Sequence, residues 1–140
     1  MAEERAPRGL TDTSVVIDLE LFEPGDLPEE ICVSTVTLAE LAAGPHAVTD
    51  SVERARRQEL LQRAEATFEA LPVDVQVARA FGRLYATATS AGRKARGRRA
   101  LDLLIAATAL AATLPLFTRN LRDFEDIAGL VEVRAAEPSA

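Results

Sequence analysis

Acidic side chains stand at three places in this sequence where a carboxylate could bind a metal ion or promote hydrolysis. Asp12 ends the stretch "GLTD", Glu40 ends "TLAE", and Asp102 precedes ten residues that carry no charge. A carboxylate at the start of so apolar a segment loses hydration at a substantial energetic cost unless a cation pairs with it. Nearby arginines or a metal ion could supply that pairing, and a bound divalent cation could activate water for attack on a phosphodiester.

Ordinary structural roles are also open to each of these positions. Asp12 could cap the helix that follows it, and Glu40 could form a capping box with the threonine three residues before it. Asp102 could interact favourably with the positive end of a helix dipole. Asn120, in "TRNLRDFED", could cap a short helix, with Asp123 three residues further on. Taken singly, these positions leave both structural and chemical roles open.

Alternating strands and helices are predicted to position these side chains. Short apolar runs indicate strands, and apolar residues at helical spacing indicate the helices between them. No tight-hairpin signal joins consecutive strands, so the connections must be crossovers, as in a parallel sheet. The predicted strands are 9–12, 31–34, 72–73, 114–118 and 130–134, and the predicted helices are 13–21, 35–43, 50–71, 74–90, 101–112 and 120–129.

This alternation predicts an α/β fold, a three-layer α/β/α sandwich with a mostly parallel central sheet. The length of 140 residues and the 48% of hydrophobic residues suit one domain with a single core. We expect this domain to take up residues 1–140, with its core at about 9–134 and a short loose tail at each end. The segment 101–112 is apolar on nearly all sides and is expected at the centre of the sandwich.

The four oxygen-bearing positions are expected to meet at one edge of this sheet. Ligands of open parallel sheets bind beyond the carboxyl ends of the strands. Asp12, Glu40 and Asn120 each follow a predicted strand closely, and Asp102 starts a helix that faces the same edge. Ionised carboxylates this close together repel one another, which a hard divalent cation would resolve. The chain has one histidine and one cysteine, so oxygen ligands and Mg²⁺ or Mn²⁺ are favoured over zinc.

Basic residues are concentrated directly before Asp102. The whole chain has a net charge of −6, so its surface in general does not attract nucleic acid. The stretch 92–99, "GRKARGRR", nevertheless holds five basic residues. It could be a solvated loop, or it could bind phosphate groups beside the acids. The candidate RNA phosphate contacts are Arg93, Arg96, Arg98 and Arg99.

Four stretches in this order resemble a PIN domain, and more specifically a VapC-type toxin of a bacterial toxin–antitoxin pair. They are "LTDTSVVID", "VSTVTLAEL", "RRALDLLIAATALAA" and "LFTRNLRDFEDIAGLVEV". The resemblance runs from about residue 9 to residue 134. It implies a parallel sheet flanked by helices and a Mg²⁺-dependent endoribonuclease, with Mn²⁺ as a possible substitute.

The same resemblance implies roles for particular acids. Asp12, Glu40 and Asp102 match the three core catalytic acids of the family, and Asp12 and Asp102 are the expected metal ligands. The fourth position, often acidic in the family, is Asn120 here. Asp123 could supply the missing charge as a fourth catalytic acid, which leaves open whether one or two metal ions bind. The residues expected to support these acids without binding the metal are Thr13, Thr118 and Asn120.

Partners and location also follow from the resemblance. It implies a cognate VapB-type antitoxin that inhibits the enzyme, an RNA substrate (tRNA, rRNA or mRNA) and a homodimer. The charged start "MAEERAPRG" lacks the apolar segment of a signal peptide, and no apolar run reaches the length of a membrane helix. We therefore expect a cytoplasmic protein with no membrane partner.

Two other interpretations compete with the nuclease. One is a catalytically silent PIN-like binding module, which Asn120 keeps open and the three core acids oppose. The other is an Asp-based phosphoryl-transfer domain. That class needs a lysine near the phosphate, and its phosphatases need a second aspartate two residues after the first. Here Ser14 takes that place, and the only lysine, Lys94, lies in the basic stretch.

Overall fold

Five strands form one sheet, in which every pair of neighbours is parallel. A computed structural model describes residues 5–139. The strands lie in the order β3-β2-β1-β4-β5, so the chain builds one half of the sheet outward from β1 and then returns to build the other half. Their bounds are β1 (Arg8–Thr11), β2 (Glu30–Ser34), β3 (Glu69–Leu71), β4 (Leu116–Thr118) and β5 (Val133–Ala135).

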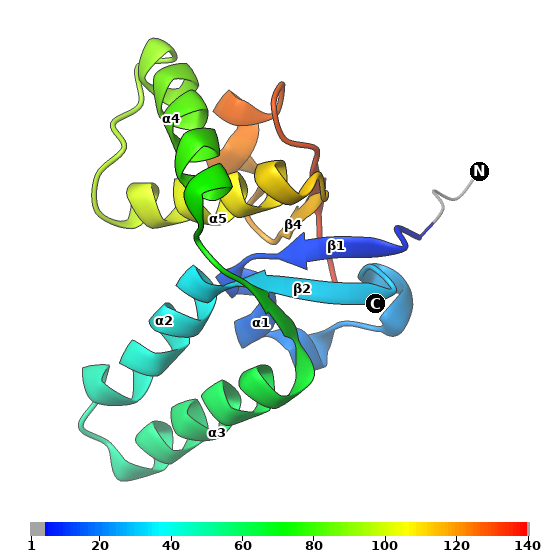
Figure 1. The fold of residues 1–140 in the computed structure, drawn as a ribbon. Coiled ribbons are helices and arrows are strands. Elements are labelled where there is room, and N and C mark those ends of the chain that lie inside the picture. Colours follow the sequence, from blue (N-terminus) through cyan, green and yellow to red (C-terminus); the bar gives the residue numbers. More distant parts are fainter. Residues whose placement is uncertain (1–4, 140) are drawn as a thin grey trace.

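Helices cover both faces of this sheet. Figure 1 shows α4 and α5 on one side of β1 and β2, with α1, α2 and α3 on the other. The expected α/β/α sandwich is therefore confirmed, and the sheet is parallel throughout its described strands. The helices are α1 (Thr13–Ile17), α2 (Thr35–Ala43), α3 (Ser51–Thr67), α4 (Val75–Ser90) and α5 (Arg98–Ala112), and the longest 3-10 helix is η4 (Leu121–Ile127).

The core is divided between the two faces of the sheet. On one face, Leu84 of α4 and Leu103 of α5 pack with Leu10 of β1 and are fully buried. On the other, Val16 of α1 packs with Val33 of β2. Alternating side chains of the strands thus supply both layers, which fixes the sheet between its helices.

The third strand lies earlier in the chain than the sequence predicted. We expected a helix to Leu71 and a strand at 72–73, but α3 ends at Thr67 and β3 is Glu69–Leu71. Glu69 pairs with Cys32 of β2 in this register. Pro72 has no amide hydrogen to donate to a neighbouring strand, which explains why the ladder stops before it.

The helix that carries Asp102 begins one turn earlier than predicted. It starts at Arg98, within the basic stretch, rather than at Leu101. Its N-cap is Gly97, whose φ of 57° lies in the left-handed region that favours glycine. Arg98 and Asp102 therefore stand one helical turn apart on the same face.

Both ends of the described chain are attached to the domain. The expected tails were 1–7 and 137–140, of which residues 1–4 and 140 lie outside the described residues. Arg5 donates a hydrogen bond from Nε to the Leu27 carbonyl at 2.8 Å. The Ser139 amide donates to Asp26 at 3.0 Å. Within residues 5–139, no helix has the length and apolar character needed to cross a membrane.

Candidate active site

The oxygen-bearing side chains gather at β1, where the order in which the chain adds strands to the sheet reverses. The chain leaves β1 toward β2 and β3, and later adds β4 on the opposite side of β1. Crevices at such switch points, outside the carboxyl ends of the strands, are the usual ligand sites of open α/β sheets. Asp12 directly follows β1, and Asn120 stands two residues beyond β4. The amide of Asp12 donates to the Phe117 carbonyl at 3.0 Å, which ties the two strand ends together.

Asp12 is buried and held by hydroxyl groups. Its Oδ1 accepts from Ser14 Oγ at 2.5 Å and from the Val15 amide at 3.3 Å, so it also caps α1. Its Oδ2 accepts from Thr118 Oγ1 at 2.6 Å. Burial raises the pKa of Asp12, and these hydrogen bonds oppose that rise. The carboxylate is therefore fixed in orientation, and none of its hydrogen-bond partners among the described residues is a cation.

Glu40 points toward the same crevice from the second turn of α2. The helix is capped by Ser34, which accepts from the Val36 amide at 3.0 Å, so Glu40 does not take part in a capping box. Its Oε1 accepts from Thr13 Oγ1 at 2.9 Å. Thr13 lies 3.0 Å from Thr37 through their hydroxyl oxygens. A chain of buried hydroxyls thus connects the start of α1 to Glu40.

Asp102 lies largely buried on the second turn of α5. Loss of hydration is the main cause that raises its pKa from 3.8 to about 6, and the nearby charges of Asp12, Asp123 and Glu40 contribute to the same rise. Arg98 opposes this rise, with Nε at 3.8 Å from Asp102 Oδ1. The shift shows that the ionised form of Asp102 is poorly compensated in the metal-free protein.

Arg98 is the basic side chain that contacts this acid cluster, by which we mean Asp12, Glu40 and Asp102. It forms an ion pair with Glu40 as well as with Asp102. Its side chain remains 63% exposed, so it reaches over the crevice from the solvent side. Among the described residues, Arg98 pairs with two of the three carboxylates and Asp12 has no ion pair, which leaves the cluster with excess negative charge.

The fourth position is filled without an acid. The backbone amide of Asn120 donates to Thr118 Oγ1 at 3.0 Å, while the Asn120 side chain makes no capping bond to η4. The capping role considered for Asn120 is therefore not seen. Asp123 is exposed on η4, close enough for its charge to act on Asp102. Thr118 links Asn120 to Asp12.

One supporting residue was missed at the sequence level. Ser14 donates to Asp12, and its Oγ also accepts from the Arg119 amide at 3.2 Å. It therefore connects the end of β1 to the chain beyond β4. A hydroxyl two residues after a capping aspartate is a common local hydrogen-bonding pattern, and that spacing was the available signal.

The basic stretch divides between two different environments. Arg99 faces away from the acid cluster and donates to both carboxylate oxygens of Asp126 at 2.6 Å. Its side chain is 11% exposed, so the expectation that Arg99 contacts RNA phosphate does not fit its position. Arg93 lies 3.9 Å from Asp126 and stays partly exposed, and Arg96 is exposed. The early start of α5 explains the difference, because consecutive residues of a helix point in different directions.

Arg99→Gln is expected to lower the free energy of unfolding by about 2–3 kcal/mol, because it removes the close cation of the buried Asp126 carboxylate and leaves only Arg93, 3.9 Å away. The matched control is Arg134→Gln, which breaks the more exposed pair with Glu132 and should cost less than about 1 kcal/mol. Urea unfolding of both variants measures the difference. Equal losses would contradict a structural role for Arg99.

A second group of ligand-type side chains lies at the other end of the strands. Glu30, Cys32 and Glu69 have donor atoms within 4.8 Å of one another. Arg8 already donates to Glu69 at 2.7 Å and lies 3.5 Å from Glu30. Glu30 and Glu69 begin their strands, whereas ligand sites of parallel sheets lie where strands end. This group is a surface ion-pair network rather than the candidate active site.

The acid cluster has the chemistry of a site for a hard divalent cation. Its donors are oxygens throughout, and neither the histidine nor the cysteine lies among them. Mg²⁺ and Mn²⁺ prefer this donor set. The raised pKa of Asp102 and the excess of carboxylates over guanidinium groups both indicate that a bound cation would stabilise the ionised cluster.

Comparisons with known proteins agree with this geometry. The PIN domain family matches residues 10–130. Ribonuclease VapC5 of Mycobacterium tuberculosis is 37% identical over 128 residues, covering 89% of this chain and 91% of that protein. Ribonuclease VapC8 of the same species is 39% identical over 110 residues, covering 78% of this chain and 96% of that protein.

Solved structures show the same fold. The structure of VapBC-5 from Mycobacterium tuberculosis, a member of the VapBC family of toxin–antitoxin systems, superposes with a TM-score of 0.79 at 35% identity, covering 94% of this chain and 98% of that one. DNA-bound VapBC from Salmonella typhimurium superposes with a TM-score of 0.72 at 25% identity, covering 93% and 98%. The chain therefore belongs to the PIN-domain family and, within it, to the VapC-type ribonucleases.

Proposed function

We propose that this protein is the toxin of a toxin–antitoxin pair and cleaves RNA internally with the help of a bound Mg²⁺ ion, which Mn²⁺ can replace. The observation that carries this proposal is the meeting of Asp12, Glu40 and Asp102 at the switch point of the sheet. The relatives are named ribonucleases, and the solved neighbours are complexes with antitoxins. We take the whole chain, 1–140, to be one domain with this single activity.

In this proposal Asp12 and Asp102 hold the cation. Asp12 is fixed by Ser14 and Thr118, so its free lone pairs have a set direction. Asp102 gains from the cation because its ionised form is otherwise poorly compensated. The bound ion would supply the Lewis acidity that makes water a better nucleophile and neutralises charge on the phosphodiester.

The other side chains position the reactants. Glu40, held by Thr13, is placed to orient the attacking water through its carboxylate. Arg98 would move from Glu40 to the phosphate, where its charge stabilises the developing negative charge. Asp123 is the candidate for a fourth acid, and Asn120 supports Asp12 through Thr118.

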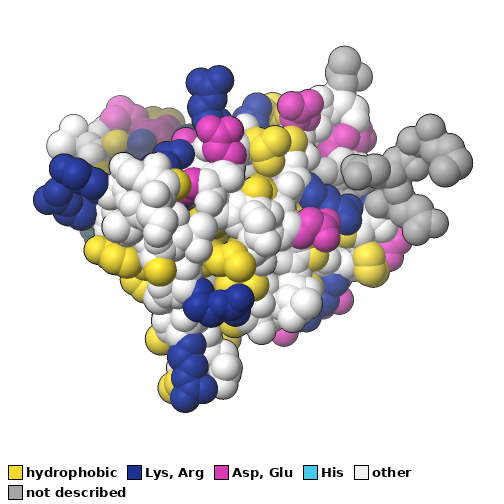
Figure 2. Space-filling model, turned by 90° about the horizontal axis from the view of Figure 1, so that it is seen from above, with side chains coloured by type: hydrophobic (Ala, Val, Ile, Leu, Met, Phe, Trp, Pro, Cys, Tyr) yellow, Lys and Arg dark blue, Asp and Glu magenta, His cyan; other side chains and the backbone are white. Residues whose placement is uncertain are grey.

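Local arginines, rather than a broad basic surface, account for RNA binding in this proposal. Figure 2 shows the Lys and Arg side chains of the face on the α4 side separated from one another by acidic and hydrophobic side chains. Arg98 contacts the acid cluster, Arg93 and Arg96 are accessible in the stretch just before it, and these three are the proposed phosphate contacts. Arg99 is removed from this set because of its pair with Asp126.

Arg96→Gln and Arg98→Gln are each expected to reduce the salt dependence of RNA binding. Loss of one phosphate contact should lower the slope of log K against log salt by about 0.7 for single-stranded RNA. The measurement is RNA binding over a range of salt, with every variant placed in the inactive Asp102→Asn background. Arg79→Gln, on the exposed side of α4, is the control and should leave the slope unchanged. Unchanged slopes in both Arg96→Gln and Arg98→Gln would mean that the stretch 92–99 is only a solvated loop.

The phosphoryl-transfer alternative is not supported by the geometry. Its lysine, Lys94, lies in the loop before α5 and lines a cavity with Tyr85 and Thr89 of α4. No lysine lies in the acid cluster, since Lys94 is the only one in the chain. The RNA-cleavage assay described below tests the alternative of a catalytically silent binding module.

The antitoxin, the homodimer and the location belong to the same proposal. We infer a VapB-type antitoxin because solved neighbours are toxin–antitoxin complexes, and a homodimer because the VapC resemblance implies one. We propose that the protein acts in the cytoplasm, where tRNA, rRNA and mRNA are found. The deciding experiment incubates the purified protein with RNA in the presence of Mg²⁺, of Mn²⁺ or of EDTA. Cleavage that requires the cation supports the proposal, and intact RNA under all conditions would support a silent module.

A further inference from the structure

A cavity of about 250 Å³ lies directly beside the acid cluster, between α1, α2 and α3. It is lined by Glu40 of the cluster and by Thr13 and Arg98, which both contact Glu40. Whatever binds in the cluster therefore has an open space next to it that is part of the same surface.

The cavity combines an apolar lining with a basic rim. Ile17, Leu41 and Leu60 supply the apolar side chains, each from a different helix. Arg56 and Arg57 of α3 line it as well, opposite Arg98 of α5. Apolar surface and guanidinium planes are the groups on which unpaired RNA bases stack.

The two arginines of α3 are held in place. Arg56 donates to both carboxylate oxygens of Glu53 at 2.8 and 2.9 Å, and Arg57 donates to Glu53 at 3.0 Å. These contacts lower the pKa of Glu53 to about 2, so the network stays ionised at neutral pH. Arg57 also donates to the Gly44 carbonyl at 3.1 Å. The rim is therefore preorganised, which reduces the entropy lost when a ligand binds.

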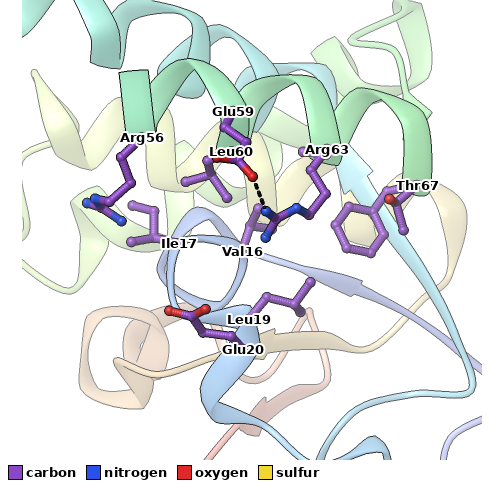
Figure 3. Close-up of a pocket in the computed structure, with 11 residues that line it drawn as sticks. Val16, Ile17, Leu19, Glu20, Arg56, Glu59, Leu60, Arg63 and Thr67 are labelled. Carbon is purple, nitrogen blue, oxygen red and sulfur yellow. Dashed lines mark hydrogen bonds and ion pairs between the residues drawn. The ribbon is translucent and has the colours of Figure 1, made fainter. Parts of the chain in front are cut away.

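A larger groove adjoins the cavity but has a different character. It has a volume of about 400 Å³, runs between α1 and α3, and shares Ile17, Arg56 and Leu60 with the cavity. Figure 3 shows Ile17 and Arg56 at one end of this groove and Thr67 at the other, with the Glu59–Arg63 pair between them. The groove extends away from the acid cluster, whereas the smaller cavity contains Glu40 itself.

We propose that the 250 Å³ cavity binds the base of a nucleotide adjacent to the cleaved phosphate and thereby selects the RNA sequence. The proposal rests on the RNA-cleaving function proposed above. A phosphate held beside Asp12 and Asp102 leaves the neighbouring base next to Glu40 and Arg98, where the cavity opens. The volume is below the 300–1,000 Å³ typical of sites for drug-sized ligands and suits a single base.

Gly44→Leu tests this proposal while leaving every acid and arginine of the site in the sequence. Gly44 has φ −52° and ψ −49°, a right-handed helical conformation open to other residues, although Pro45 after it adds some strain for a residue with a Cβ. A Cβ there would meet Arg57 Cδ at 3.5 Å, an ordinary contact, and a leucine would fill part of the cavity. The control is Gly129→Leu, where an added Cβ meets no atom within 4 Å.

The readout is kcat/KM for a set of RNA oligonucleotides that carry each of the four bases on either side of the cleaved bond. The wild type should prefer one base, and Gly44→Leu should lower kcat/KM for that base by about tenfold or more and flatten the preference. Mn²⁺ affinity, measured by calorimetry, should stay unchanged in Gly44→Leu. Gly129→Leu should behave as the wild type in both measurements.

A second pair of variants guards against misfolding of Gly44→Leu. Arg56→Gln removes one rim arginine, and Arg63→Gln removes an arginine of the same helix that lies outside the cavity. Their side chains are 60% and 59% exposed, and each pairs with a glutamate of α3. Arg56→Gln should lower kcat/KM for the preferred base by about fivefold, roughly the value of one lost exposed cation–π contact. Arg63→Gln should not.

Three results would overturn the proposal. One is a wild type that cleaves all four bases at equal rates, and another is an unchanged base preference in both Gly44→Leu and Arg56→Gln. The third is weaker antitoxin binding by Gly44→Leu with cleavage unaltered, which would assign the cavity to the protein partner. A wild type that cleaves no RNA with Mg²⁺ would overturn the proposed function itself, and so is distinct from these outcomes.

Discussion

Asp102→Asn is expected to reduce RNA cleavage by on the order of a thousandfold and yet to stabilise the metal-free protein at pH 8. Removing one preorganised electrostatic contact to a reacting group costs about 10²–10³ in rate, and this change would also weaken the cation site. The gain in stability arises because the charge that serves catalysis destabilises the metal-free protein. Asp102 is largely buried, so its ionised form carries a desolvation penalty that asparagine avoids.

The pH dependence of stability follows from the raised pKa of Asp102. Its folded-state pKa of about 6 exceeds the ordinary 3.8, so the folded protein holds this proton more tightly than the unfolded chain does. The free energy of unfolding therefore falls as the pH rises from about 4 to about 6. A two-unit shift corresponds to about 3 kcal/mol, and partial exposure to solvent reduces this to about 2 kcal/mol. Asp102→Asn should remove this contribution.

Thermal or urea unfolding between pH 4 and pH 8, in EDTA and in Mg²⁺, measures these effects. Mg²⁺ should stabilise the wild type by mass action and should stabilise Asp102→Asn far less. Glu125→Gln, an exposed change on η4, is the control and should match the wild type in stability and cleavage. Equal Mg²⁺ affinity in the wild type and Asp102→Asn would show that Asp102 does not hold the cation.

The acid cluster could be predicted from the sequence because topology alone brings it together. Asp12 follows a strand and Glu40 lies one turn into a helix that follows a strand. In a parallel sheet such positions meet at one edge, whatever the side-chain packing. The two threonines at 13 and 118 follow from the resemblance, and the structure places both against the acids.

The distribution of the arginines could not be predicted in the same way. Arg98 and Arg99 are neighbours in sequence, yet one contacts Glu40 and the other Asp126. Which residue faces which acid depends on the helix starting at Arg98, and capping by Gly97 is a weak sequence signal. The partner Asp126 lies 27 residues away on a 3-10 helix. Long-range side-chain pairing of this kind depends on where the tertiary fold places η4, which packs against α4 and β5, and spacing in the sequence does not show it.

Asp12→Asn is expected to abolish the growth arrest that the wild-type protein should cause when it is expressed without an antitoxin. Asparagine keeps a side-chain oxygen, which can still accept from Ser14 and cap α1, so the fold should lose only about 1 kcal/mol. It lacks the negative charge that the cation requires, so cleavage should fall by on the order of a thousandfold. The comparison therefore separates loss of charge from loss of structure.

The matched control is Asp74→Asn, since Asp74 caps α4 by accepting from the Val77 amide at 3.0 Å and lies outside the acid cluster. Both variants remove an aspartate cap charge, but only Asp12→Asn should restore growth on inducing medium.

Immunoblotting of soluble extracts checks that all proteins accumulate equally, and sequencing of RNA ends identifies the cleaved sites. Cells that express the wild type or Asp74→Asn should yield the same set of cleaved RNA ends, and cells that express Asp12→Asn should yield none of them. Arrest that persists in Asp12→Asn at equal protein levels would mean that toxicity arises from binding rather than from cleavage, because this variant keeps the surface of the protein while losing the charge at its centre.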